Sequence, residues 1–133
     1  MEKRILGNTD IEISPVGLGC MGLSHAFGTP LERAEAAEKI KAAYDMGYTF
    51  FDTAECYTGT NPDGTTAYNE EAVGEGIKGF RDKIVLATKC EVKFTGKSME
   101  LDSSPAAIRK AIEGSLHRLQ TDYIDLYYQH RVD

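Results

Sequence analysis

The sequence of 133 residues has no tryptophan, four prolines, three cysteines and no long hydrophobic run. A membrane-spanning helix needs about 18 or more apolar residues, so we expect neither such a helix nor a membrane partner. The start, Met-Glu-Lys-Arg, leads into no apolar stretch, which argues against a secretory signal. Basic side chains number 15 and acidic ones 21, for a formal net charge of −6. A negative surface argues against nucleic acid as the main partner.

Cys20, Cys56 and Cys90 are odd in number and form no C-x-x-C pair. This is not the pattern of a disulfide-stabilised secreted protein, so we expect a reducing, cytoplasmic setting. The three histidines lack ligand-like spacing to the cysteines, and no metal site is predicted. Two interpretations of the thiols stay open. Either they line a functional site, which alkylation would block, or they pack as small apolar side chains.

The hydrophobic pattern predicts an N-terminal hairpin followed by alternating strands and helices, in one domain over residues 1–133. Predicted strand ends at Gly19, Asp52, Lys89 and His130 lie 33, 37 and 41 residues apart. Connections of this length that contain a helix make neighbouring strands parallel. The predicted class is therefore α/β. A (β/α) barrel and an open doubly wound sheet both fit this pattern.

Apolar runs and capping residues give the expected bounds of these elements. Strands are expected at 3–6 and 11–13, around a Gly7–Asp10 turn, and later at 16–19, 49–52, 84–89 and 123–130. Helices are expected at 31–46, from Asn69 to Phe80, and from Pro105 to Leu119. Their N-caps are predicted to be Thr29, Asn69 and Ser104. The intervening segments, 58–68 and 90–103, are expected to be loops.

Residues Gly17 to Gly22 match the dinucleotide-binding pattern G-x-G-x-x-G. In that fold a helix begins within the motif, so that its N-terminus meets the pyrophosphate. Here Thr29-Pro30 delays the predicted helix, and Asp52 lies 30 residues beyond Gly22, farther than the roughly 20 residues expected of the acidic partner. We interpret these glycines as a tight turn at a strand end.

Asp52, Lys89 and His130 each end an apolar predicted strand, and Tyr57 follows Asp52 by five residues. The C-terminal ends of parallel strands form the active-site edge of barrels. A lysine beside a packed interior needs a counterion, and Asp52 is the available one. An ammonium group favours the phenolate form of a tyrosine, and a histidine can donate to a substrate oxygen. These types suit carbonyl reduction with hydride from a cofactor. The alternative is a structural ion pair with a surface tyrosine and a core histidine.

The sequence resembles the aldo-keto reductase family in runs that follow the same order along the whole chain. These runs are Val16–Gly22, Phe51–Tyr57, Asn69–Gly74, Ala87–Lys89 and Asp122–His130. The resemblance implies a (β/α)8 barrel with a hairpin plugging its bottom, of which this chain holds the hairpin, four strands and three helices. It also implies NADPH-dependent reduction of an aldehyde or ketone.

The resemblance implies roles for single residues as well. Tyr57 would be the general acid and Lys89 its activating neighbour, while Asp52 would pair with Lys89 and His130 would orient the carbonyl. The implied cofactor contacts, beside the nicotinamide ribose, are Gly19, Cys20, Met21 and Asp52.

The chain departs from the family in two ways. The segment 58–68 is longer and more polar than the usual short turn, which changes the rim of the pocket. The four further strand-helix units that the family implies, with most of the dinucleotide contacts, are absent from the 133 residues. We therefore interpret the chain as an N-terminal half barrel with little turnover of its own. The alternative is a non-catalytic module whose open strand edges pair with a second copy or with another chain.

Overall fold

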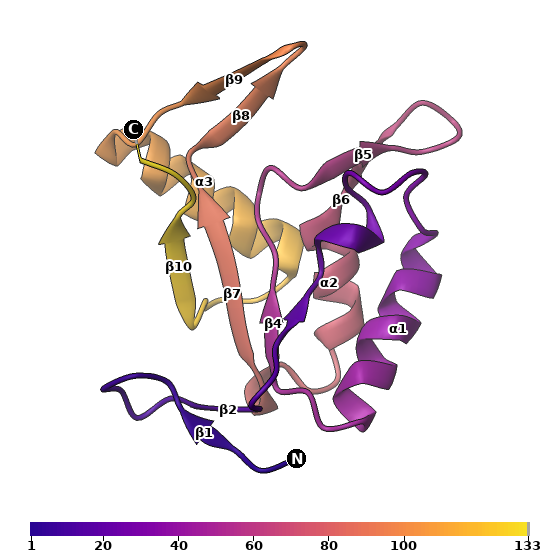
Figure 1. The fold of residues 1–133 in the computed structure, drawn as a ribbon. Helices are drawn as coiled ribbons and strands as arrows, with labels where there is room; N and C mark the ends of the chain where they lie inside the picture. Colours follow the sequence, from indigo (N-terminus) through magenta and orange to yellow (C-terminus); the bar gives the residue numbers. More distant parts are fainter. Residues whose placement is uncertain (133) are drawn as a thin grey trace.

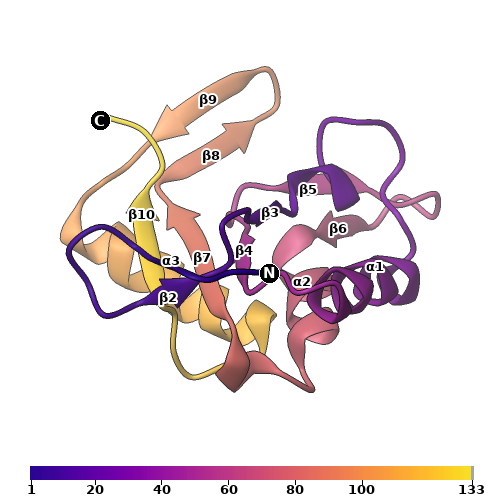
Figure 2. The same ribbon diagram turned by 60° about the horizontal axis from the view of Figure 1, so that its bottom comes forward.

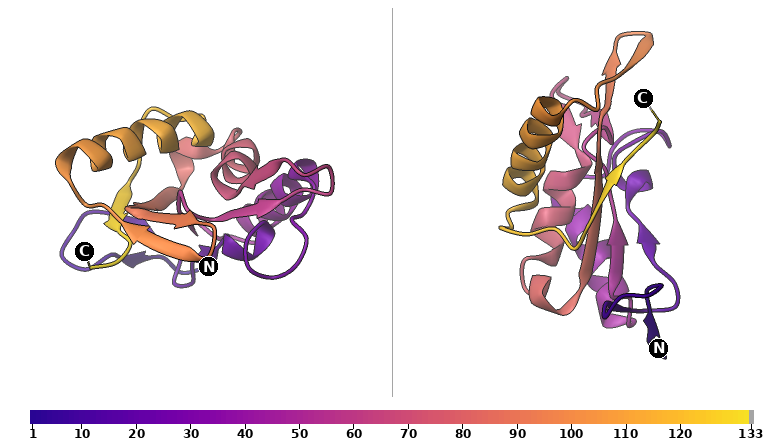
Figure 3. Two further views of the ribbon diagram at one scale, coloured as in Figure 1. Left: turned by 90° about the horizontal axis from the view of Figure 1, so that it is seen from above. Right: turned by 90° about the vertical axis from the view of Figure 1, so that its left-hand side faces the viewer.

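The chain folds into a four-stranded parallel sheet with three helices packed on one face (Figures 1 and 3). A computed structural model describes residues 1–132, and Asp133, the last residue of the predicted domain, lies outside them. The strand order is β10-β7-β4-β3. The strands are β3 (Leu18–Gly19), β4 (Phe50–Asp52), β7 (Val85–Cys90) and β10 (Leu126–Gln129), and the helices are α1 (Arg33–Asp45), α2 (Asn69–Ile77) and α3 (Pro105–Leu119).

The predicted N-terminal hairpin is confirmed. β1 (Arg4–Ile5) pairs antiparallel with β2 (Glu12–Ile13), and the hairpin lies at the N-terminal end of the parallel strands (Figures 1 and 2). Gly7 has φ +56° at its turn, and the Thr9 hydroxyl donates to the Leu6 carbonyl at 2.6 Å. The hairpin therefore occupies the end of the sheet opposite the predicted functional residues.

One apolar core joins the helices to the sheet. Its largest fully buried side chains are Phe51, Ile40, Ile77, Leu86 and Leu119. Burying one side chain of this size stabilises the fold by about 1.5–3 kcal/mol. β7 is buried from its first residue through Thr88, because it has a neighbouring strand on each side. β10 has a neighbour on one side among the described residues, and its Tyr128 is 42% exposed.

Two of the three predicted N-caps are wrong. α1 begins at Arg33 with Glu32 as N-cap, because Leu31 N–H donates to the Leu23 carbonyl and holds Thr29-Pro30 in the preceding loop. Asn69 is the first residue of α2, and its side chain bonds to other segments. The third prediction is confirmed, since Ser104 Oγ accepts from Ala107 N–H at 3.3 Å.

Both predicted loops contain antiparallel hairpins. β5 (Thr58–Thr60) pairs with β6 (Thr66–Tyr68), and β8 (Val92–Thr95) pairs with β9 (Ser98–Leu101). Gly64 and Gly96, at the turns, have φ of +86° and +63°, which glycine adopts without steric cost. Both hairpins stand at the C-terminal end of the sheet (Figure 1). No helix within residues 1–132 is long and apolar enough to cross a membrane.

Helices α2 and α3 approach each other most closely at Gly74. A Cβ added there would lie 2.7 Å from the carbonyl carbon and oxygen of Leu119 and 2.8 Å from the Arg118 oxygen. These are backbone atoms at the end of a helix, so they cannot rotate away as a side chain would. The contact therefore requires glycine for steric reasons.

We predict that Gly74→Ala lowers the free energy of unfolding by about 1–3 kcal/mol, since the methyl group must push α2 and α3 apart. Urea unfolding followed by circular dichroism measures the change. The matched control is Gly79→Ala, where an added Cβ meets no atom within 4 Å, and we expect a change within about 0.5 kcal/mol. Equal stabilities of the two variants would contradict the prediction.

Candidate active site

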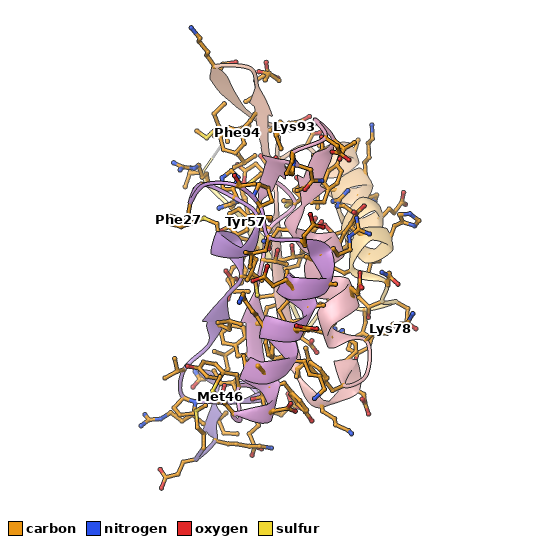
Figure 4. All side chains as sticks on the ribbon, turned by 90° about the vertical axis from the view of Figure 1, so that its right-hand side faces the viewer. Phe27, Met46, Tyr57, Lys78, Lys93 and Phe94 are labelled. Atoms are coloured by element: carbon orange, nitrogen blue, oxygen red, sulfur yellow. The ribbon has the colours of Figure 1, made fainter. Side chains whose placement is uncertain are left out.

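The predicted residues Asp52, Tyr57, Lys89 and His130 gather at the C-terminal end of the sheet. Asp52 ends β4, Lys89 lies in β7, and His130 directly follows β10. Pairing aligns Asp52 with Ala87 and Tyr128 with Lys89, which brings the three strand ends to one edge. Tyr57 lies in the segment between β4 and β5, at the same end of the molecule as Phe94 (Figure 4).

Lys89 is the centre of this group. Its Nζ lies 2.6 Å from Asp52 Oδ2, 2.7 Å from the Thr53 carbonyl oxygen and 3.4 Å from Tyr57 Oη. The Lys89 side chain is 15% exposed and that of Asp52 is 34% exposed. An ammonium group has three N–H donors, so each donor has one acceptor. The ion pair predicted from the sequence is present, with the tyrosine hydroxyl as its third partner.

Tyr57 is fixed by its backbone and by two ring contacts. Its N–H donates to the Ala54 carbonyl, and its own carbonyl accepts from Asn69 N–H at 2.9 Å. The His25 ring stacks on the phenol ring, with centroids 5.6 Å apart, and the His130 ring lies edge-on with centroids 5.7 Å apart. The tyrosine is therefore an ordered part of the site and not a loose surface residue.

His130 is held by backbone hydrogen bonds and by a thiol. Its backbone N–H donates to the Cys90 carbonyl at 3.3 Å, and Nδ1 of its ring lies 3.4 Å from Cys56 Sγ. Burial lowers the pKa of His130 below its ordinary value, and the positive charges of Lys89 and Arg131 lower it further. The imidazole is therefore neutral at pH 7, with one N–H to donate.

Two glutamates that the sequence analysis did not identify support this arrangement. Glu91 is 2% exposed, and its carboxylate accepts from the Arg131 N–H at 3.2 Å and from the Gln129 side chain at 3.5 Å. Glu55 accepts from the Glu91 N–H at 2.9 Å, and burial raises its pKa. Isolated glutamates beside a strand end carry no periodic signal, so the sequence alone could not reveal this role.

The site also has an aromatic rim that the sequence analysis missed. His25 Nδ1 lies 2.6 Å from the Thr58 carbonyl oxygen, which accepts only, so Nδ1 carries a proton. The His25 ring also stacks on Phe94, with centroids 6.0 Å apart. Phe94 belongs to β8, in a segment predicted to be a loop. Predicting a hairpin over residues 92–101 would have indicated that Phe94 lies near the site.

All three cysteines are free and buried. Burial raises the pKa of the Cys20 thiol to about 12 and that of Cys56 to about 11. A buried, protonated thiol is a poor nucleophile, which favours the interpretation as small apolar side chains over that of an alkylation-sensitive set. Cys90 Sγ donates to the Tyr128 carbonyl at 3.5 Å, and Cys20 packs in the apolar core as a small apolar residue would. Cys56 differs, because it contacts His130.

The predicted cofactor contacts lie beside this group, at the end of β3. Gly19 pairs with Asp52, and an added Cβ would meet no atom within 4 Å. Cys20 fixes the turn, since its N–H donates to the Asp52 carbonyl and its own carbonyl accepts from Asn69. Met21 begins the 3₁₀ helix η1 (Met21–Leu23). An open glycine face next to a part-exposed carboxylate fits a hydroxylated ring such as a ribose.

The arrangement at Met21 also agrees with our interpretation of the G-x-G-x-x-G match, because the next α-helix begins only at Arg33. Residues 1–132 contain no group of three His, Cys, Asp or Glu side chains that could hold a metal ion.

Comparison with known proteins gives consistent results. The model of the Aldo/keto reductase family matches residues 15–133. The chain is 44% identical to "Probable aldo-keto reductase 1" of Glycine max over 130 residues, which are 96% of this chain and 36% of the relative. This chain therefore spans about a third of the length of that curated relative.

Solved structures agree with this match. The "putative aldo-keto reductase" of Pseudomonas aeruginosa superposes with a TM-score of 0.81 at 32% identity, covering 97% of this chain and 47% of the other. The holo form of aldo-keto reductase AKR11C1 of Bacillus halodurans superposes with a TM-score of 0.78 at 38% identity, covering 96% and 39%. These neighbours are (β/α)8 barrels, and the present sheet and helices correspond to about half of one.

The lowered pKa of His130 makes stability depend on pH. As pH falls below the ordinary histidine pKa of about 6.5, the unfolded chain binds a proton before the folded chain does. The free energy of unfolding therefore decreases as pH falls from that value toward the folded-state pKa. We predict a larger loss between about pH 7.5 and pH 5.5 for the parent than for His130→Asn in urea unfolding. Parallel pH dependences of the two proteins would contradict this prediction.

Proposed function

Because the chain belongs to the Aldo/keto reductase family, we propose that it contributes the proton-transfer residues of an oxidoreductase that reduces an aldehyde or ketone to an alcohol. The observation that carries this proposal is the contact of 3.4 Å between Lys89 Nζ and Tyr57 Oη. The match covers 36% of the curated relative, so the activity is proposed for the protein in which these residues are complemented by a full cofactor site.

The proposed proton donor is Tyr57. Lys89 donates to the phenol oxygen, as well as to Asp52 and Thr53, so that oxygen is an acceptor toward the lysine. The phenol proton is then directed elsewhere, toward a bound carbonyl oxygen. When the proton leaves, the negative charge on the phenolate faces an ammonium group, which stabilises it. This is the electrostatic condition for a tyrosine to act as a general acid near neutral pH.

The proposed partner of Tyr57 is His130. Its pKa is lowered by burial, so it stays neutral and uses its N–H as a hydrogen-bond donor. Its ring lies edge-on to the Tyr57 ring, so the phenol and imidazole donors lie close together. A donor aimed at the carbonyl oxygen stabilises the negative charge that develops there. We assign it an orienting role.

The proposed cofactor is NADPH, which supplies the hydride when it is bound. Gly19, Cys20, Met21 and Asp52 are the residues of this chain proposed to hold its nicotinamide ribose. Asp52 uses Oδ2 to bind Lys89, and its other oxygen can accept from a ribose hydroxyl. Gly19 leaves space beside it, and Cys20 fixes the turn that leads to Met21.

The proposed substrate is a small carbonyl compound with an apolar substituent. Phe94 is 54% exposed and Phe27 is 74% exposed, and both lie at the end of the molecule that holds Tyr57 (Figure 4). The stacked rings of His25, Tyr57 and Phe94 add a flat apolar surface. Aromatic faces of this kind pack well against flat or apolar groups.

We predict that Tyr57→Phe and Lys89→Met lower carbonyl reduction by about 10²–10⁴-fold, as expected for the loss of general acid catalysis. The measurement is NADPH oxidation with an activated aldehyde by the protein that carries these residues. The matched controls are Tyr123→Phe, at a tyrosine that contacts Arg81 ahead of β10, and Lys41→Met, at an exposed lysine of α1. Rates in Tyr57→Phe and Lys89→Met equal to those of the parent and the controls would refute the assigned roles.

A second candidate function is association through the open sheet. β3 and β10 each pair with one strand among the described residues, and an unpaired strand edge is a template for pairing. For this alternative we predict a dimer of the chain by native mass spectrometry or light scattering. A well-folded and strictly monomeric chain would exclude pairing with itself.

A further inference from the structure

We propose that Cys56 is a positioning residue for His130. Its thiol donates a hydrogen bond to His130 Nδ1 and thereby holds the ring in the tautomer that carries its proton on Nε2. Cys56 Sγ lies 3.4 Å from Nδ1, and Cys56 is 8% exposed. The consequence for carbonyl reduction rests on the function proposed above, whereas the hydrogen bond and the tautomer do not.

The direction of the hydrogen bond follows from counting protons. Burial raises the pKa of Cys56 to about 11, so the thiol keeps its proton at neutral pH. The lowered pKa of His130 leaves one proton on the imidazole. A neutral imidazole nitrogen is a good acceptor, while a thiol sulfur is a weak one. The thiol proton therefore points at Nδ1, and the imidazole proton must be on Nε2.

Neighbouring groups keep the ring from reversing this arrangement. The backbone on both sides of His130 is fixed, because His130 N–H donates to the Cys90 carbonyl and Arg131 N–H donates to the Glu91 carboxylate. A ring flip would place a carbon against the sulfur and leave the buried thiol without this acceptor. The charged groups that act on the ring are Lys89, Arg131, Asp52 and Glu91.

This tautomer is the one that the proposed reaction needs. A carbonyl oxygen only accepts hydrogen bonds, so a ring nitrogen that orients it must carry a proton. The other tautomer would present a lone pair to the oxygen and repel it. Because the two ring nitrogens point in diverging directions, binding Nδ1 to Cys56 leaves Nε2 for the substrate. Cys56 thereby makes His130 a donor without touching the substrate itself.

The test is nitrogen-15 NMR of the chain labelled in histidine, with the His130 signals assigned by His25→Asn and His117→Asn. In the parent at neutral pH we expect His130 to have its proton on Nε2. In Cys56→Ala the fraction with the proton on Nδ1 should rise several-fold. Cys56→Ser retains a donor and should restore the parental tautomer. These signals require neither cofactor nor turnover, so failure of the proposed reduction and failure of this inference are distinguishable.

The matched control is Cys90→Ala, which removes a buried thiol whose hydrogen bond goes to the Tyr128 carbonyl. We expect the parental tautomer there. If His130 in the unsubstituted chain carries its proton on Nδ1, the proposal is overturned, whether or not any variant folds. Equal tautomer fractions in Cys56→Ala and the parent, or an equal change in Cys90→Ala, would also overturn it.

Discussion

The ammonium group of Lys89 is the interaction on which the candidate site depends. Its three acceptors come from the end of β4, from the Thr53 backbone and from Tyr57. A cation that is 15% exposed is stable only when its donors are satisfied. β7 lies between β4 and β10, so a residue at its end can reach the groups that both neighbours present. The central place of β7 in the sheet therefore decides where the chemistry collects.

Asn69 shows how the surrounding loops are held around that centre. Its side-chain oxygen accepts from the Thr53 hydroxyl at 2.6 Å, and its amide donates to the Cys20 carbonyl and to Ser24 Oγ, both at 2.8 Å. Its backbone N–H donates to the Tyr57 carbonyl. One fully buried side chain thus connects the segments after β3 and β4 to the start of α2. Because every polar atom of this amide has a partner, its hydrogen bonds offset the cost of burying it and hold the three segments together.

The strands and the residues at their ends were predictable because burial leaves a direct trace in the sequence. The N-caps of the helices were harder to predict than the strands. Thr29-Pro30 and Ser104-Pro105 carry the same sequence signature, but a helix begins only at Ser104-Pro105. A cap forms only where no stronger partner competes for the backbone, and such partners come from distant segments. The same holds for Glu91 and His25, whose contacts arise from residues 33 to 40 positions away. Sequence patterns record local periodicity and burial, and not these long-range pairings.

The two proposed donors have one feature in common, which is a neighbouring group bound at their second polar position. Tyr57 and His130 are both neutral side chains, and each becomes a directed donor because a neighbour occupies its other polar position. Lys89 donates to the phenol oxygen at 3.4 Å, and Cys56 lies at the same distance from Nδ1 of the imidazole. The phenol proton and the Nε2 proton are then the two that remain for one acceptor oxygen with two lone pairs. Burial serves both neighbours in different ways, since it strengthens the hydrogen bonds of the ammonium group to its acceptors and keeps the thiol protonated. Loss of the donor at position 56, as in Cys56→Ala, would therefore release the tautomer of His130, although Cys56 itself touches no substrate.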